Sequence, residues 1–162
     1  MFKHLTVILA FLIMLSSPVA AQDFQKGVAA YNAGDYATAL QEWTPLAEQG
    51  YDSAQYNLGF MYRNGKGVPQ DYAEAVKWYR LAAEQAHTNA QGNLGLMYEY
   101  GEGVLQDNTM AHMWYNIASA NGHDKSGEWR DERAGLMTNA DISKAQAMAR
   151  ECMSSGYTKC VY

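Results

Sequence analysis

The sequence predicts an all-α fold, an α-solenoid of stacked helix-turn-helix repeats closed by a C-terminal helical cap. Residues 54–87 and 90–123 align at a constant offset of 36, and 17 of the 34 aligned positions are identical. Inside each copy, apolar residues recur at helical spacing on both sides of a glycine-containing loop. A fixed period of this length is typical of solenoids, because one helix pair cannot bury its apolar face alone. We expect eight helices and no sheet.

The first 21 residues have the composition of a secretory signal peptide. A short polar start precedes an apolar run over 5–15, and small residues follow up to Ala21. The run has 11 residues, too few to cross a bilayer core of about 30 Å. We expect cleavage after Ala21. The mature chain would then comprise residues 22–162 and be periplasmic or secreted, with no membrane insertion.

Charge and cysteine content narrow the classes of partner. The chain has 12 basic and 17 acidic residues, a formal net charge of −5, and such a surface repels the phosphate backbone of nucleic acids.

Its two cysteines, Cys152 and Cys160, lie close together near the C-terminus. An oxidising compartment favours a bond between close thiols. We expect a structural disulfide, and a redox-active thiol is the alternative.

Residues 53–87 form the clearest repeat unit. Apolar spacing predicts two helices, which Gly65 and Gly67 separate. Asp71 is expected to cap the second helix, with Glu74 completing a capping box. The core positions are Ala54, Leu58, Met61 and Tyr62 in the first helix, and Ala75, Trp78, Tyr79, Ala82 and Ala83 in the second.

Two further units flank this one. Residues 88–123 repeat it, with Asp107 as the helix cap and with core positions at Ala90, Leu94, Met97, Tyr98, Ala111, Trp114, Tyr115 and Ala118. Residues 22–52 form a degenerate first unit, in which 35–39 match 71–75 at the same offset and the loop is shorter. We expect a tight helix-turn-helix over 30–36.

The period ends after residue 123, and we interpret 124–162 as the cap that covers the open end of the core. A helix is expected over 128–137. Thr138 is then expected to cap a last helix. The apolar stripe of that helix is Ile142, Ala145, Ala149 and Cys152.

The two clear copies resemble the Sel-one-like repeat, a relative of the tetratricopeptide repeat, and the first unit looks closer to a plain tetratricopeptide hairpin. The residues that carry the resemblance in the third unit are Ala90, Leu94, Gly95, Tyr98, Gly101, Gly103, Val104, Asp107, Ala111, Trp114 and Ala118. The tail also resembles the end cap of bacterial members. The resemblance implies an adaptor in signalling, secretion, envelope maintenance or host contact.

No residue pattern predicts catalysis, a metal or a cofactor. The glycine pairs at 65/67 and 101/103 each follow a helix and lack the third glycine of a dinucleotide-binding fingerprint, so we interpret them as loops. His87 and His123 recur at the offset of 36 and are expected at turns, because equivalent sites in neighbouring units stand too far apart to share one ion. His112 has no ligand-spaced partner.

The conspicuous aromatic residues are expected to pack in the core. Those at 78, 79, 114 and 115 lie on the apolar helix faces of the repeat. Trp43 and Trp129 are less constrained, and we leave them open between core and contact surface.

By resemblance, the first helix of each unit lines the inner curve of the solenoid, so its positions off the core face are the contact candidates. Side-chain amides there can hydrogen-bond an extended peptide, although they can equally satisfy helix ends within the repeat. The candidates are Gln55, Asn57, Phe60, Arg63, Asn64, Gln91, Asn93, Leu96, Glu99 and Tyr100.

The leading hypothesis is therefore an exported, monomeric protein-protein interaction module that is not an enzyme and that binds a protein or peptide partner in its concave groove. One alternative is a hydrolase acting on cell-wall or β-lactam substrates. Cysteine-rich relatives linked to penicillin binding carry a cysteine pair in each repeat, whereas residues 22–151 contain none. The other alternative is a self-associating structural protein of the envelope.

Overall fold

The computed structural model describes residues 18–160, which form eight α-helices and no strand. The expected all-α fold is confirmed. Most of the predicted signal peptide, residues 1–17, lies outside the described residues. The helices are α1 (Pro18–Asn32), α2 (Tyr36–Glu48), α3 (Asp52–Asn64), α4 (Tyr72–Ala83), α5 (Thr88–Tyr100), α6 (Asn108–Ala120), α7 (Ser126–Ala134) and α8 (Asn139–Ser154).

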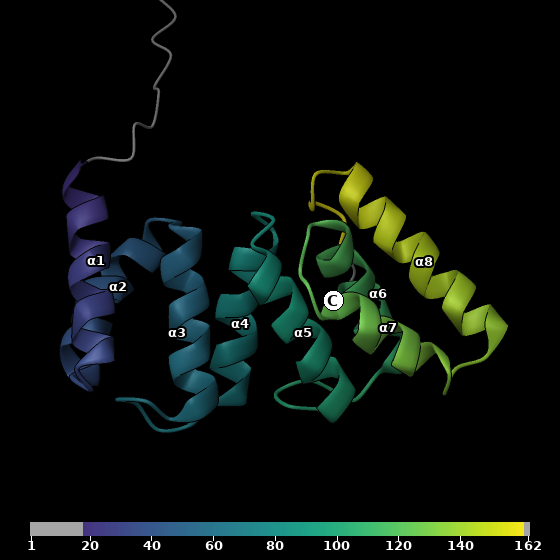
Figure 1. Cartoon of the computed structure of the whole chain (residues 1–162), viewed down its shortest axis with the longest axis horizontal. Helices are drawn as coiled ribbons and strands as arrows, with labels where there is room; N and C mark the ends of the chain where they lie inside the picture. The colour runs from purple at the N-terminus through teal and green to yellow at the C-terminus, as the bar shows by residue number, and fades with distance from the viewer. Residues whose placement is uncertain (1–17, 161–162) are drawn as a thin grey trace, which may run out of the picture.

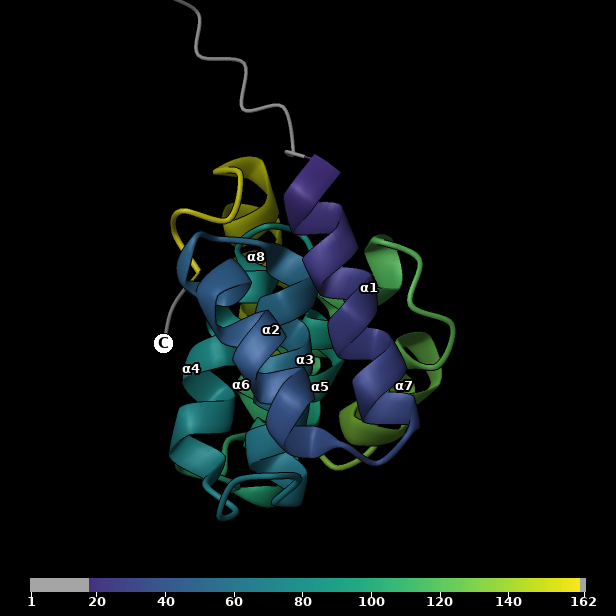
Figure 2. The same cartoon turned by 90° about the vertical axis from the view of Figure 1, so that its left-hand side faces the viewer.

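The helices stack in a row of antiparallel pairs (Figure 1), and each packs on the next along the chain. Viewed along the row, the odd-numbered helices lie mainly on one side and the even-numbered helices on the other (Figure 2). The exception to sequential packing is α8, which returns to pack on α6 and so covers the end of the row. Within residues 18–160, none of the helices has the length and apolar content needed to cross a membrane.

Aspartate caps start the second helix of each repeat unit. The Asp71 carboxylate accepts hydrogen bonds from two backbone amides of α4, and the Asp107 carboxylate does the same for α6. The expected capping box at Glu74 is wrong, because the Glu74 carboxylate pairs with Lys77 at 3.1 Å. In a capping box, the Glu74 carboxylate would accept a hydrogen bond from the Asp71 backbone amide. Here that amide donates to the carbonyl of Tyr62 instead.

The two glycines of each loop have different roles. Gly65 and Gly101 end their helices in the left-handed conformation, with φ of 62° and 69°. The second glycine makes a close approach between units. A Cβ on Gly103 would lie 2.3 Å from the carbonyl oxygen of Tyr72, at the start of α4. The loop interpretation of both glycine pairs is therefore confirmed, and the loop also sets the spacing to the preceding unit.

A glycine of the first helix receives an aromatic ring of the second helix in each hairpin. A Cβ on Gly59 would lie 2.6 Å from the Tyr79 ring, and one on Gly95 would lie 2.3 Å from the Tyr115 ring. In the degenerate first unit, the corresponding atom on Gly27 would lie 2.3 Å from the Trp43 indole. No side chain larger than hydrogen fits at these positions while the ring stays in place.

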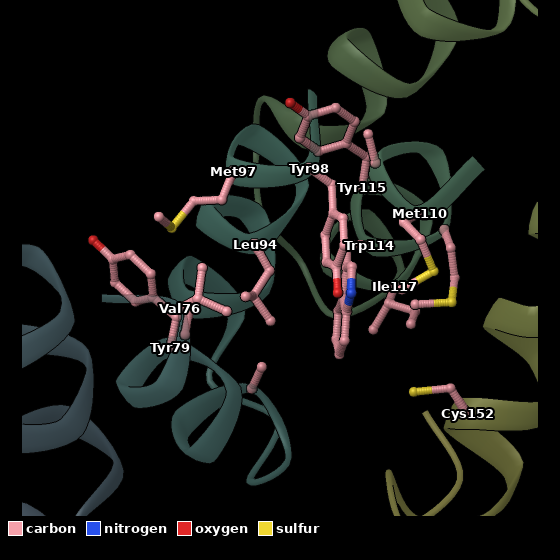
Figure 3. Close-up of a cluster of buried hydrophobic side chains, with 14 of the residues drawn as sticks. Val76, Tyr79, Leu94, Met97, Tyr98, Met110, Trp114, Tyr115, Ile117 and Cys152 are labelled. Atoms are coloured by element: carbon pink, nitrogen blue, oxygen red, sulfur yellow. The ribbon is translucent and has the colours of Figure 1, made fainter. Parts of the chain in front are cut away.

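The core forms two clusters of buried side chains. One lies among α2 and α3, and the larger one extends from α4 to α8 (Figure 3). Tyr79, Trp114 and Tyr115 are fully buried, as expected, and Trp43 is also in the core. Trp78 is only half-buried, because it lies at the edge of the smaller cluster with the ammonium of Lys77 over its ring.

The cap differs slightly from expectation. Helix α7 begins at Ser126, two residues before the expected start. It ends at Ala134, three residues before the expected end. Thr138 caps α8 by accepting a hydrogen bond from the Asp141 amide at 3.2 Å. A disulfide joins Cys152 and Cys160, whose Cα atoms are 4.5 Å apart.

We predict that Gly95→Ala destabilises the protein by about 1–3 kcal/mol, because the added methyl group overpacks the Tyr115 ring. Alanine favours a helix over glycine by about 1 kcal/mol, so a loss of stability identifies the ring contact as the cause. Urea unfolding followed by circular dichroism measures the change.

The matched control is Gly127→Ala. The nearest atom to that methyl group is the Ser119 hydroxyl oxygen at 3.1 Å, which can rotate away. We expect a change within about 1 kcal/mol. Equal stability of Gly95→Ala and wild type would contradict the proposed role of the ring contact.

Candidate binding face

The ten contact candidates lie on α3 and α5, and the structure separates them by burial. Gln55 is 3% exposed, and both the nitrogen and the oxygen of its amide group form hydrogen bonds. Its Nε2 donates to the carbonyl of Ala47 at 3.0 Å, and its Oε1 accepts from Gln85 at 2.8 Å. Gln55 therefore connects two neighbouring units, and it is no longer a candidate for contact with a partner.

Gln91 repeats this arrangement one unit later. It is fully buried, donates to the carbonyl of Ala83 at 3.1 Å, and accepts from Asn121 at 2.8 Å. Asn121 also donates to the Tyr157 hydroxyl at 2.7 Å, so the C-terminal tail closes the network. The contacts of both glutamines therefore support a structural role within the repeat.

An aromatic pocket opens between α1 and α3. Its volume is about 220 Å³, and it is lined by Tyr31, Trp43, Tyr56, Asn57 and Phe60. Trp43 forms its floor at 3% exposure, and Phe60 stands at its edge at 36% exposure. The Trp43 Nε1 donates to the carbonyl of Phe24 at 3.2 Å, which fixes the indole. Asn57 supplies the one side-chain amide.

The edge of the pocket continues into the next unit through Tyr56. Its ring stacks on His87 with centroids 4.7 Å apart, and Asn93 lies near its hydroxyl. Burial raises the pKa of the Tyr56 hydroxyl. Asn93 therefore lies beside the pocket rather than apart from it.

The two charged candidates, Arg63 and Glu99, are held in ion pairs with residues outside their own helices. Arg63 of α3 donates to Glu102, in the loop after α5, at 3.0 Å. Glu99 of α5 pairs with Arg133 of α7, and its other oxygen accepts from the Tyr115 hydroxyl at 2.6 Å. Burial, followed by the hydrogen bond to Glu99, raises the pKa of Tyr115. These side chains orient neighbouring units as well as lining the face.

The remaining candidates differ in exposure. Asn64 is exposed, but its amide donates to the carbonyl of Phe60 at 2.8 Å, at the end of its own helix. Leu96 is half-buried against the larger core cluster. Tyr100 is 62% exposed and is the most open aromatic group of the face. The candidates that remain accessible and are not held by the contacts described above are Asn57, Phe60, Asn93, Leu96 and Tyr100.

Sequence reasoning missed Tyr31 and Tyr56 as members of the pocket, and left Trp43 open. Tyr31 belongs to the part of the degenerate first unit where the shorter loop breaks the alignment with the later units. Trp43 aligns with the core residue Tyr79 at the offset of 36, so its place in the core could have been predicted. Tyr56 aligns with Gly92 at the offset of 36, and this break in the repeat was the available signal. A position that holds a large aromatic residue in one copy and glycine in the other is one whose surroundings differ between units.

The three histidines of residues 18–160 are His87, His112 and His123. His87 caps α5, as expected for a turn residue, by accepting a hydrogen bond from the Ala90 amide at 3.3 Å. His112 is 2% exposed, and its Nδ1 has no hydrogen-bond partner among the described residues. Across residues 18–160, no group of three or more histidine, cysteine, aspartate or glutamate side chains could hold a metal ion.

Comparison with known proteins gives the following similarities. The Sel1 repeat family model matches residues 52–87 and 88–123. A protective antigen present in uropathogenic Escherichia coli strains and displaying an SLR fold has a TM-score of 0.80 at 28% identity, over 85% of this chain and 31% of that chain. No curated protein matches the chain.

A second solved structure, a Sel1 repeat protein from Oxalobacter formigenes, has a TM-score of 0.64 at 34% identity, over 66% of this chain and 44% of that chain. The chain thus spans less than half the length of either relative. Both similarities support the helix-pair solenoid described above.

We predict that acidification weakens the fold in the range where free histidine titrates. Burial lowers the pKa of His87, His112 and His123, whereas unfolded histidine has a pKa of about 6.5. The unfolded chain therefore binds more protons below pH 6.5, and stability falls as pH falls, by at most about 1.4 kcal/mol per pH unit for each histidine. Urea midpoints at pH 7.5 and 5.5 measure the effect.

His112→Leu removes one of the three groups, and we expect it to reduce the difference between the two midpoints. A pH dependence as large as that of the wild type would show that His112 does not contribute.

Proposed function

From the premise that this chain is a Sel1-repeat protein, with repeats at 52–87 and 88–123, we propose that it is an exported adaptor that binds an extended segment of a partner protein along the odd-numbered helices. Sel1 repeats generally mediate protein-protein interaction. The aromatic pocket between α1 and α3 is the observation that carries the proposal, because it is a concave apolar site on the expected inner face.

The pocket favours one apolar side chain of the partner as an anchor. Aromatic groups form its floor and its edge, and burying one large apolar side chain there contributes about 1.5–3 kcal/mol. Asn57 at the edge offers one donor and one acceptor to the backbone beside the anchor. Asn93, next to Tyr56, offers a second amide one unit further along. An extended peptide can use such amides because its own backbone groups are unpaired.

The far end of the face offers a second, weaker contact. Tyr100 is exposed at the end of α5, and an amphipathic ring suits an interface in which one side stays in water. Leu96 lies one turn before it. Between the two ends, the ion pairs of Arg63 and Glu99 supply a polar rim. Aromatic anchors surrounded by polar groups are typical of protein interfaces.

Export rests on two independent features. The amino-terminal residues have the signal-peptide pattern, and the Cys152–Cys160 disulfide suits an oxidising compartment. Sel1-repeat proteins are typically non-enzymatic scaffold modules, and the site described above consists of contact groups. We therefore favour the adaptor over the hydrolase and over the self-associating structural protein.

We predict that a photoreactive benzophenone amino acid in place of Asn57 forms a covalent adduct with the partner in cells, and that Phe60→Ala lowers the adduct yield about tenfold. Loss of roughly 1.4 kcal/mol of apolar burial corresponds to that factor. Adducts are measured by mass spectrometry of the purified protein.

The matched control is Leu81→Ala on α4, because Leu81 is 38% exposed and Phe60 is 36% exposed. We expect Leu81→Ala to leave the yield unchanged. The same adducts from a photoreactive group placed at Leu81, or an unchanged yield from Phe60→Ala, would contradict the assignment of the face.

We predict that the protein recovered from the cell envelope begins at Gln22. A signal peptidase requires small residues at the cleavage point, so Ala21→Leu should leave the precursor uncleaved. Mass spectrometry of the intact protein distinguishes the two lengths. A wild-type protein that retains its first 21 residues would exclude cleaved export.

A further inference from the structure

A second, larger groove lies at the cap end, on the side of the even-numbered helices. Its volume is about 700 Å³, and its walls come from α4, the loop before α6, the start of α6, and α8. Tyr98 forms part of its floor and follows Leu96 by two positions, which places it on the opposite side of α5 from the binding face. The groove is therefore separate from the aromatic pocket.

The floor and rim of the groove are apolar. Tyr98 and Met110 are each 6% exposed, and Met148 and Val104 are half-buried. Leu105 stands at the rim with 90% of its surface exposed. Methionines adapt to the shape of what they contact, and a ligand in the groove could cover the largely exposed Leu105 side chain.

The charges that face the groove are mainly positive. Arg80 of α4 donates to the Tyr98 hydroxyl at 2.9 Å, which holds the guanidinium at one wall. Lys144 of α8 is exposed at the opposite wall and forms no ion pair among the described residues. The one carboxylate, Asp107, accepts from the amides of Thr109 and Met110 at 2.7 and 3.1 Å, so the α6 terminus offsets its charge.

The groove differs in charge from the chain as a whole, which has a net charge of −5. Two cationic side chains, Arg80 and Lys144, and one carboxylate, that of Asp107, line it. A carboxylate of a partner that reaches the exposed Lys144 is attracted there, whereas an ammonium group is repelled.

The groove is a property of the cap rather than of the repeat. Leu105 aligns with Pro69 of the preceding unit, and Lys144 and Met148 come from α8, which has no counterpart earlier in the chain. The exposed Leu105 and the cationic side chains on the two walls therefore occur together only at this end of the described solenoid. The equivalent surface of the preceding unit lacks both the leucine and the α8 wall.

We propose that this groove binds a short acidic-apolar segment of a partner protein, whose apolar side chains pack on Met110, Met148 and Leu105 and whose carboxylates face Arg80 and Lys144. The open shape of the groove between two helices suits a peptide segment, and charge complementarity selects an acidic one. This site adds a second contact to the adaptor and does not depend on the first.

The test is methyl NMR of the purified protein with 13C-labelled methionines. Three heptapeptides are the probes: one alternates leucine with glutamate, one alternates leucine with lysine, and one alternates serine with glutamate. We expect saturable shifts of the Met110 and Met148 methyl signals with the leucine-glutamate peptide alone. Leu105→Ala should weaken this binding about tenfold, and Lys144→Gln about three- to fivefold.

The matched controls are Leu136→Ala and Lys125→Gln, which change an exposed leucine and an exposed lysine of the cap outside the groove. We expect both to bind as the wild type does. Equal binding of the leucine-lysine peptide, or no saturable shift, would overturn the proposal.

Two further outcomes would assign the groove to another occupant and overturn the proposal as well. Saturable binding of decanoate without binding of the leucine-glutamate peptide would indicate a small anionic amphiphile. Methyl shifts that change when the protein alone is diluted would indicate a second copy of this chain.

Discussion

The contact between a helix glycine and an aromatic ring within each hairpin determines the rest of the structure. Tyr79 lies on Gly59, and Tyr115 lies on Gly95, so closely that an added methyl group would overlap the ring. A glycine in a helix costs about 1 kcal/mol relative to alanine, and here it lets the ring pack directly on the backbone of the partner helix. The distance between the two helices of a unit, and hence the shape of the unit, follows from this contact.

Stacking of the units depends on a different set of contacts. Gln55 and Gln91 each bond to a carbonyl of the preceding unit, and Gly103 approaches the backbone of Tyr72. Both kinds of contact require a fixed distance along the chain, which explains why the period of 36 residues is kept. At the third junction, Gly127 occupies the position of the glutamine, and the solenoid stops. The tail then closes the network through Tyr157, behind the Cys152–Cys160 disulfide.

Both candidate sites lie where the repeat pattern is broken. The aromatic pocket uses the degenerate first unit, and the second groove uses the cap helix α8. In a regular solenoid, each unit covers its neighbour in the same way, so the surface is repetitive. At an irregular junction, side chains that would pack on an equivalent neighbour meet a different one, which leaves room for a partner. The two ends of this short solenoid are therefore better placed for specific recognition than its middle.

The sequence by itself determined the helices, their caps and the loops. Asp71, Asp107, Gly65 and Gly101 act through neighbouring backbone, so their roles follow from local chemistry and from the repeated period. The tertiary structure decided which positions off the core face are accessible. Gln55 and Asn57 are two residues apart and both polar, yet Gln55 is buried between units and Asn57 lines the pocket. That difference arises from the helix of the adjacent unit packed beside them, and such a contact leaves no mark in the local pattern.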